Sequence, residues 1–560
     1  MDSEKESVFS RNSTGLVREI SPHHAFIYNF MAIGLCTFTW VTLFSIAYSS
    51  SFSGSSIGLA VILLAIAAVP FYLCTSMLSS AMPRAGGDYV WQSRILHPAI
   101  GFAAAFSAWT VWQWYFSGFL GVVITTLGFQ PYFALLGRTN ASFASLSATL
   151  GQNFGYNTSV FEITTAIILL GLLVAALGIK FYVKLQYILF GGSLVSALTL
   201  LGVLASTTHA QFVSSLNSFS NQIIQSSGNQ TLATTVQANG GYYGYIIKMG
   251  ELSHAPFSLH GTLLLWGVIW LSFGYAFWSI YNLSEIKKAG NLGTQVWIQV
   301  GSSLSFAIFL IALWYLLERV VGVDFLTSYY TQFYSGGVAA NPLAAFFTPY
   351  YPALIASISS SPIIWTLILV GLTFGLFQVI LIVYFASTRI MLAASIDRVL
   401  PQKISCVSDR THSPFVALLI SAIGCEAFLY LIIYQSNLLS YFGTAGLATQ
   451  IAYILICVTA ISLPFRRKDV YKNSPAGKYK VGRVPLLSIL GVISLAVNLF
   501  IAWIFIFGPP LGALSVSTLG SIEFVSGIFA ACLLLYFVSW AVRKSRGVDL
   551  RFAFSEIPPE

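Results

Sequence analysis

Long apolar stretches, separated by shorter polar ones, run along the chain from residue 26 to residue 542. Each has about twenty residues or more, the length that an α-helix needs to cross a hydrocarbon layer of ~30 Å. The pattern predicts an all-α polytopic membrane protein with twelve transmembrane helices. They are expected at 26–50, 56–80, 99–127, 161–179, 185–206, 260–284, 296–320, 362–394, 414–434, 440–463, 485–508 and 520–542.

Composition agrees with a membrane-spanning chain. Only 8% of the residues are charged and 56% are hydrophobic, whereas a soluble protein of this size has about a quarter charged residues. Residues 20–83 contain no Asp, Glu, Lys or Arg, and such a run is tolerated outside a protein core only in lipid. The polar N-terminal residues do not have the pattern of a cleavable signal peptide.

The distribution of positive charge predicts the orientation. Of 27 Lys and Arg residues, only Arg138, Lys248 and Arg319 fall on one face of the predicted topology, and the other 24 (27 minus 3) fall on the opposite face. Positive residues remain on the cytoplasmic side, so both tails, residues 1–25 and 543–560, and the basic loop 464–484 are expected in the cytoplasm, with the helices in the plasma membrane. The net charge of +9 follows from this topology and attracts anionic lipid rather than nucleic acid.

The sequence lacks the motifs of several classes of enzyme and of metal-binding protein. No spacing of His, Cys and carboxylates suggests a metal site, and neither a phosphate-binding loop nor a serine-nucleophile elbow is present. We therefore expect no enzyme and no cofactor. No soluble segment is long enough for a nucleotide-binding domain, so any transport has to draw its energy from a gradient.

Three motifs follow one another, each at the predicted cytoplasmic end of a helix. The first is Pro83-Arg84-Ala85-Gly86-Gly87-Asp88-Tyr89 followed by Arg94; the second is Asn282-Leu283-Ser284-Glu285-Ile286-Lys287-Lys288; the third is Arg389, Ala393, Asp397, Leu400 and Pro401, with Pro414 opening the next helix. Together they resemble the amino acid–polyamine–organocation family of secondary transporters. In the second motif Ser284 replaces the family's first Glu and Ala289 its Pro.

The resemblance implies a leucine-transporter-like fold. Its ten-helix core would occupy residues 26–463 as two inverted repeats of five helices, and residues 485–542 would form the two accessory helices. Helices one and six of such a core break at the membrane midplane, where the substrate binds. The sequence has a glycine in each, Gly34 and Gly274. Helix one lacks the family's usual Gly-Ser-Gly run.

The two breaks predict a site for the backbone of an α-amino acid. The N–H groups of Leu35, Cys36 and Thr37 would begin a half-helix that attracts a carboxylate. Carbonyl groups left free near Ile33, Ser272 and Phe273 would accept an ammonium group. By similarity to the family, Trp112 and Phe116 of helix three would face the pocket, and helix six would add Tyr275 and Phe277 beside its break at Gly274.

The predicted pocket is uncharged. Helices one, three and six have no Asp, Glu, Lys or Arg near their centres, and an unpaired substrate charge would be costly in such a site. We therefore expect a substrate with a neutral side chain.

Coupling has two sets of candidates. Glu426 is a carboxylate within helix nine, and such a residue is a candidate proton carrier. Ser387 and Thr388 of helix eight resemble the paired hydroxyls of sodium-coupled relatives, but lie near the inner end. The lysine of some proton-coupled relatives is missing from helix five, whose only lysine, Lys184, is at its start. Glu285 is expected to hold the inner gate with a Lys or Arg partner.

The sequence favours an importer of a neutral amino acid, coupled to protons rather than sodium. Two alternatives remain open. The protein could exchange amino acids or amines, or it could be a membrane sensor that keeps the fold without transport.

Overall fold

The computed structural model describes residues 15–34, 46–48, 50–150, 157–250, 256–334, 343, 346, 351–435, 444–509 and 518–556. Within these residues, eleven helices are long and apolar enough to cross a membrane. The first predicted span, 26–50, is described only in part: α1 (Pro22–Ile33) is its beginning, and Leu35, Cys36 and Thr37 lie outside the described residues. The first of the twelve spans therefore stays a prediction.

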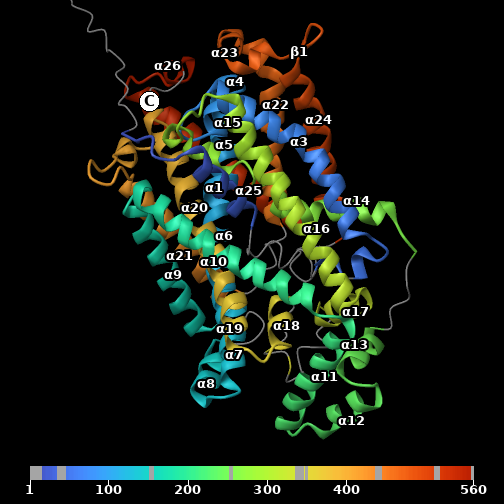
Figure 1. The fold of residues 1–560 in the computed structure, drawn as a ribbon. Helices are drawn as coiled ribbons and strands as arrows, with labels where there is room; N and C mark the ends of the chain where they lie inside the picture. Colours follow the sequence, from blue (N-terminus) through green and yellow to red (C-terminus); the bar gives the residue numbers. More distant parts are fainter. Residues whose placement is uncertain are drawn as a thin grey trace, which may run out of the picture.

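The spanning helices form one elongated bundle (Figure 1). In chain order they are α3 (Ile57–Ala81); α5 (Pro98–Phe106), η2 (Ser107–Val111), α6 (Trp112–Val123), η3 (Ile124–Phe129) and α7 (Gln130–Gly137) as one continuous rod; α9 (Thr158–Ala176); α10 (Ile179–Ser206); α14 (Leu259–Phe273) with η4 (Trp278–Glu285); α15 (Leu292–Val296), η5 (Trp297–Gly301) and α16 (Ser302–Val321); α19 (Pro362–Trp365), η7 (Thr366–Val370) and α20 (Gly371–Ile396); α21 (Phe415–Tyr434); α22 (Thr444–Arg466); α24 (Leu486–Phe507); and α25 (Thr518–Ser545).

Most predicted spans agree with these bounds to within a few residues, because a run of apolar residues in lipid has to be helical to satisfy its own backbone. The main error is in the third span, predicted to end at residue 127, whose rod continues to Gly137. Polar residues such as Thr125, Thr126 and Gln130 interrupt the apolar pattern there, but all three side chains are buried against protein.

Close packing of the bundle depends on small residues. Gly118 of α6 faces α21, and a Cβ atom at this position would lie 3.2 Å from the backbone nitrogen of Leu429. Ser196 of α10 donates a hydrogen bond to the carbonyl of Ile368 in η7 at 2.8 Å. Helices in lipid associate through such close backbone contacts and interhelical hydrogen bonds, since lipid gives them little hydrophobic reason to associate.

One end of the bundle collects the basic loops and both ends of the described chain. Ile20 and Ile286 form a parallel bridge, and the carbonyl of Gly15 contacts the His412 ring at 3.1 Å. Short elements cover this end, uppermost in Figure 1: α4 (Asp88–Ile95), η8 (Gln402–Ser405), α23 (Lys468–Asn473), η10 (Pro475–Lys478), β1 (Lys480–Val481) paired antiparallel with β2 (Val484–Pro485), and α26 (Arg551–Ser555). The predicted basic loops thus lie on one face, which we call the inner end.

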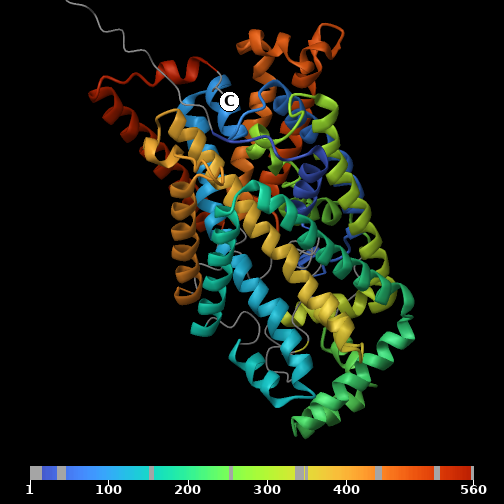
Figure 2. The same ribbon diagram turned by 60° about the vertical axis from the view of Figure 1, so that its left-hand side comes forward.

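The opposite end carries additional short helices. In Figures 1 and 2, α11 (His209–Ser226), α12 (Gln230–Ala238), α13 (Tyr242–Gly250) and α17 (Val323–Tyr334) pack together there. α8 (Ala141–Thr149) and α18 (Tyr351–Ser357) lie against α7, and η1 (Ser50–Phe52) lies against α14. The hydroxyl of Thr208 and the side chain of Gln211 form a capping box at the start of α11. These short helices lie between the predicted spans, and the sequence did not predict them.

Candidate functional site

The candidate site begins where α1 ends. Ser21 caps the first turn of this helix, and its last helical residue is Ile33. Gly34 follows with φ of 120°, a conformation that side chains with a Cβ rarely adopt. The chain therefore leaves the helical path at the glycine that the sequence singled out. The hydroxyl of Ser272 donates a hydrogen bond to the carbonyl of Ile33 at 2.6 Å, so the end of α1 lies directly against α14.

A second interruption lies opposite. α14 ends at Phe273, and helical geometry resumes only in η4, beginning at Trp278. Two tyrosine hydroxyls bind the backbone at this point. Tyr453 of α22 donates to the carbonyl of Gly274 at 2.9 Å, and Tyr72 of α3 donates to the carbonyl of Phe273. The break is thus held in place by side chains from two other helices.

These contacts correct one expectation from the sequence. The carbonyls near Ile33 and Phe273 were expected to be free for a substrate ammonium group, but each accepts a hydroxyl hydrogen bond, from Ser272 and Tyr72 respectively. The reason is that a buried carbonyl without a partner costs about 1–3 kcal/mol. Each oxygen keeps a second lone pair, so a substrate would share these groups rather than find them vacant.

Aromatic side chains surround the second interruption. Tyr275 and Phe277 are buried, and the ring of Trp109 in η2 meets both edge-on, with centroids 6.4 Å and 5.8 Å away. Trp109 also contacts the Tyr453 ring at 5.4 Å. Trp109 is therefore one of the residues of this rod that contact the break.

The two positions that the family resemblance placed in the pocket lie farther along the same rod. The Trp112 ring stacks on Tyr115 at 5.2 Å and meets Phe524 of α25 edge-on at 5.7 Å. Phe116 follows one turn later and is 8% exposed. A substrate contact for Trp112 and Phe116 remains a prediction.

Asn29 joins the pieces and was not identified from the sequence. Its side-chain oxygen accepts the backbone N–H of Ser279 at 2.8 Å, and its amide nitrogen donates to the carbonyl of Ile298 at 3.4 Å. This single side chain ties α1 to η4 and η5. The sequence gives only a weak signal for such residues, a polar atom within an apolar stretch, as at Asn29, Tyr72 and Tyr453. Their hydrogen-bond partners are more than 170 residues away in the chain.

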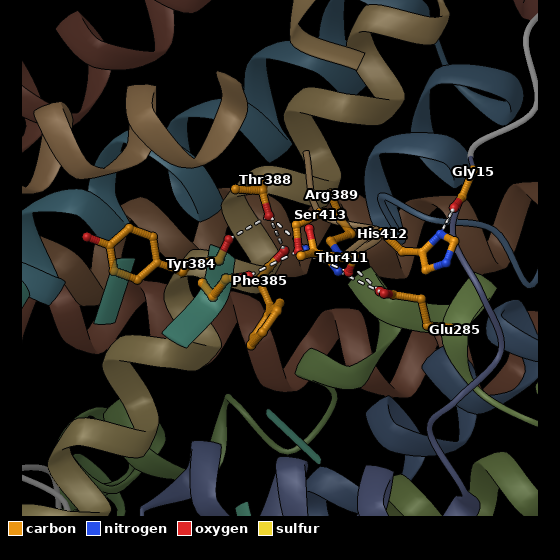
Figure 3. A network of polar contacts seen from close by, with 10 residues as sticks. Gly15, Glu285, Tyr384, Phe385, Thr388, Arg389, Thr411, His412 and Ser413 are labelled. Atoms are coloured by element: carbon orange, nitrogen blue, oxygen red, sulfur yellow. Dashed lines mark hydrogen bonds and ion pairs between the residues drawn. The ribbon is translucent and has the colours of Figure 1, made fainter. Parts of the chain in front are cut away.

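An ion pair closes the inner side of the site. Arg389 of α20 donates two hydrogen bonds to Glu285 at 2.9 Å and 2.8 Å, and both side chains are buried (Figure 3). The expectation that Glu285 has a basic partner is confirmed. Because the chain around Glu285 also binds the N-terminal segment, with Ile20 N–H donating to the Glu285 carbonyl at 2.9 Å, the pair joins α20, η4 and the N-terminal segment.

A second ion pair lies between the other two motifs. Arg94 of α4 binds Asp397 at 2.6 Å, and the Tyr89 hydroxyl donates to the same carboxylate at 2.8 Å. Arg94 also donates to the Ala553 carbonyl at 3.5 Å and lies 5.0 Å from the Phe554 ring. The C-terminal element α26 therefore packs onto this pair. The three sequence motifs form one buried polar layer at the inner end.

The coupling candidates lie outside the break. The Ser387 hydroxyl contacts the Ser421 hydroxyl of α21 at 3.0 Å. The Thr388 hydroxyl accepts a hydrogen bond from Arg389 at 3.1 Å, and Figure 3 shows these two residues. Glu426 of α21 accepts a hydrogen bond from Thr165 of α9 at 2.9 Å. The Ser387 and Thr388 hydroxyls therefore have separate partners, and Glu426 bridges two helices at the side of the bundle.

Comparison with known proteins gives one result for nearly the whole chain. The family model described as amino acid permease matches residues 26–528. No curated protein sequence matches this chain.

Proposed function

The chain belongs to the amino acid permease family and transports amino acids across a membrane, and from this premise we propose that it imports a neutral amino acid across the plasma membrane by alternating access. The observation that carries the proposal is the meeting of two helix ends, at Ile33 and at Phe273, joined by the Ser272 hydroxyl. Both are C-terminal ends, whose carbonyl groups suit the substrate's amino group. The predicted donors to its carboxyl group are the N–H groups of Leu35, Cys36 and Thr37, which lie outside the described residues.

The inner end supports a state closed toward the cytoplasm. Two buried ion pairs, Glu285 with Arg389 and Arg94 with Asp397, join α4, η4 and α20 across the predicted exit. Substrate release to the inside would require these elements to separate, and transport would alternate between this state and one in which the pairs are broken.

Proton coupling is favoured over sodium coupling. A sodium site needs several oxygen ligands turned toward one point, as other hard cations do. Ser387 and Thr388 instead bind different partners, and Thr388 lies next to the positive guanidinium of Arg389, which would repel a cation. Glu426 is the carboxylate that the sequence named for this role, but it bridges α21 and α9 at the side of the bundle, so a carboxylate beside the break is the better candidate.

Uptake by proteoliposomes tests the proposal. Labelled neutral amino acids should accumulate under an inward pH gradient in sodium-free buffer, and unlabelled neutral amino acids should compete, whereas putrescine and spermidine should not. Accumulation that needs sodium and ignores pH would contradict proton coupling. Exchange without net accumulation would identify an exchanger, and specific binding without any flux would identify a sensor.

A further inference from the structure

Buried charge is scarce in the described part of the chain, and one buried charge lacks a counterion. Five charged side chains are buried there: Asp88, Arg94, Glu285, Arg389 and Asp397. Four of them form the two ion pairs at the inner end. Asp88, fully buried in the first motif, is the fifth. A buried carboxylate without a paired cation is costly, and it lowers this cost by binding a proton.

The loop before Asp88 presses this residue against η4. Gly86 and Gly87 have φ of 90° and 48°, and a Cβ atom on Gly87 would lie 2.6 Å from the Ile280 side chain. The Gly86 N–H donates to the Tyr281 carbonyl at 3.2 Å. Only glycines allow this approach, so the first motif is built to place the carboxyl of Asp88 beside helix six.

The atoms around the carboxyl group suit a proton better than a metal ion. Its Oδ2 atom accepts hydrogen bonds from Trp109 Nε1 at 2.9 Å and Gln92 Nε2 at 3.2 Å, while Oδ1 has no partner with good hydrogen-bond geometry. Both neighbours of Oδ2 are N–H donors, which repel a cation. The described residues contain no cluster of three or more metal-ligating side chains. Oδ1 can carry a proton.

Trp109 connects this carboxyl group to the helix break. Its indole N–H binds Asp88, while its ring lies edge-on to Tyr275 and Phe277 and contacts Tyr453, which holds the Gly274 carbonyl. A change in the charge of Asp88 changes the strength of the hydrogen bond that positions the Trp109 ring. The charge of Asp88 and the shape of the candidate substrate site are therefore coupled through Trp109.

The other titratable groups near Asp88 on the elements packed against it are already engaged. Arg94 and Tyr89 of α4 both bind Asp397, which follows α20. Arg389 of α20 binds Glu285 of η4. On α22, Arg466 donates to the carbonyls of Ile95 and Leu96, and the Tyr453 hydroxyl binds Gly274; on η4, the Tyr281 hydroxyl faces the carboxyl group.

The surroundings of the Asp88 carboxyl group bring its pKa close to neutral pH. α4 lies between the spans Ile57–Ala81 and Pro98–Gly137. Burial raises the pKa of Asp88 to about 7, and the hydrogen bond from Trp109 and the nearby Tyr281 hydroxyl oppose the rise. Asp88 can therefore gain and lose a proton within the physiological range.

We propose that Asp88 carries the proton that drives uptake. The inference rests on the proposed proton coupling and assigns its residue. In the closed state the carboxyl group is neutral and holds a proton taken from outside. When the inner end opens, water reaches the group, the O–H bond breaks, and the proton leaves to the cytoplasm with the substrate. The carboxylate that remains, held by Trp109 and Gln92, is ready for the next proton.

The decisive experiment compares Asp88→Asn with Glu426→Gln in proteoliposomes. Asparagine imitates the neutral carboxyl group, so Asp88→Asn should keep substrate counterflow but lose accumulation driven by a pH gradient. Glu426→Gln should keep both. Full gradient-driven accumulation by Asp88→Asn, or its loss in Glu426→Gln alone, would overturn the assignment. A wild type that ignores pH would overturn the coupling proposal itself and the role of Asp88 with it.

A second variant covers the case in which Asp88→Asn does not fold. Trp109→Phe keeps a ring but removes the N–H that stabilises the carboxylate, so the pKa of Asp88 should rise. The pH midpoint of uptake should then move upward by about half a unit to one unit. An unchanged midpoint in a folded Trp109→Phe protein would contradict the proposal. Competition by putrescine in the wild type, lost in Asp88→Asn, would instead make Asp88 a ligand for a cationic substrate.

Discussion

At the scale of single residues, the candidate site depends on backbone geometry more than on charged groups. Gly34 ends the helical path of α1. The carbonyl groups exposed at the two interruptions accept hydrogen bonds from the hydroxyls of Ser272, Tyr72 and Tyr453. Such hydrogen bonds make an interrupted helix stable inside a membrane, where an unsatisfied carbonyl finds no water. The functional groups of this site are therefore mainly main-chain atoms that side chains position.

Gly34→Leu tests the first interruption. A β-carbon is strained at φ of 120°, at a cost of about 1–3 kcal/mol, and the added side chain would fill the space beside the helix end. Uptake should be abolished while expression stays near normal. Gly202→Leu is the matched control, because Gly202 is an exposed helical glycine whose added Cβ would meet no atom within 4 Å, and it should transport normally. Full uptake by Gly34→Leu would refute the requirement for an interrupted helix.

Asp88 also predicts how stability depends on pH. Burial raises its pKa from 3.8 to about 7, so the folded protein holds a proton that the unfolded chain releases between these values. Its contribution to the free energy of unfolding is complete below the lower value and is lost as the pH rises through the higher one. The Tm of the solubilised wild type should fall between about pH 5 and about pH 8 more steeply than that of Asp88→Asn.

The control for this experiment is Asp469→Asn. Asp469 is exposed, and the hydrogen bond from Arg467 lowers the pKa of its carboxyl group, so its titration ends below the tested range. This variant should keep the slope of the wild type. Identical slopes for Asp88→Asn and the wild type would show that Asp88 does not titrate there.

At the scale of elements, the inner end is held by buried polar contacts among segments far apart in the chain. α4 binds α20 through Arg94 and Asp397, and η4 binds α20 through Glu285 and Arg389. Apolar packing between helices has no preferred direction, whereas an ion pair is either made or broken. Two buried pairs therefore suit elements that alternate between two positions.

Breaking one pair should favour the inward-open state. Glu285→Gln leaves Arg389 buried without its counterion, and removing one partner of a buried pair costs about 3–5 kcal/mol. We expect a lower Tm and greater labelling, from the inside, of a cysteine placed in the exit path. Glu285→Gln combined with Arg389→Met should cost less than the sum of the two single changes. Additive costs would show that the pair is not a unit. Asp469→Asn breaks an exposed pair and should change the Tm little.

At the scale of the whole molecule, the distribution of charge gives the chain its predicted orientation. The basic loops and both ends of the described chain meet at the inner end, and the helices α11, α12, α13 and α17 lie at the other end (Figure 1). This arrangement agrees with the positive-inside prediction that the inner end faces the cytoplasm.

Cysteine labelling in sealed cells tests the orientation. Asn473→Cys lies at the exposed end of α23 and Ser226→Cys at the exposed end of α11, and both belong in a background with Cys406, which is exposed, changed to Ser. An impermeant reagent should label Ser226→Cys from outside and Asn473→Cys only after permeabilisation. The reverse pattern would invert the topology.

The sequence by itself determined the class of the protein, the positions of most spans, the expected orientation and the two glycines Gly34 and Gly274. It could do so because lipid imposes a local rule: about twenty consecutive apolar residues, with charge outside them, form a spanning helix whatever their neighbours are. The basic partner of Glu285 was also expected from the motif, although the sequence did not indicate which basic residue it is.

Only the tertiary structure decided how the interrupted helix ends are satisfied and which buried charge stands alone. Asp88 lies in a loop motif, and its neighbours Trp109 and Tyr281 come from two other elements. The carbonyls expected to be free proved to be bound because Tyr72 and Ser272 reach them across the bundle. Hydrogen bonding and charge depend on atoms within a few ångströms in space, and residues 239 positions apart in the chain, Ile33 and Ser272, meet here only because the helices pack as they do.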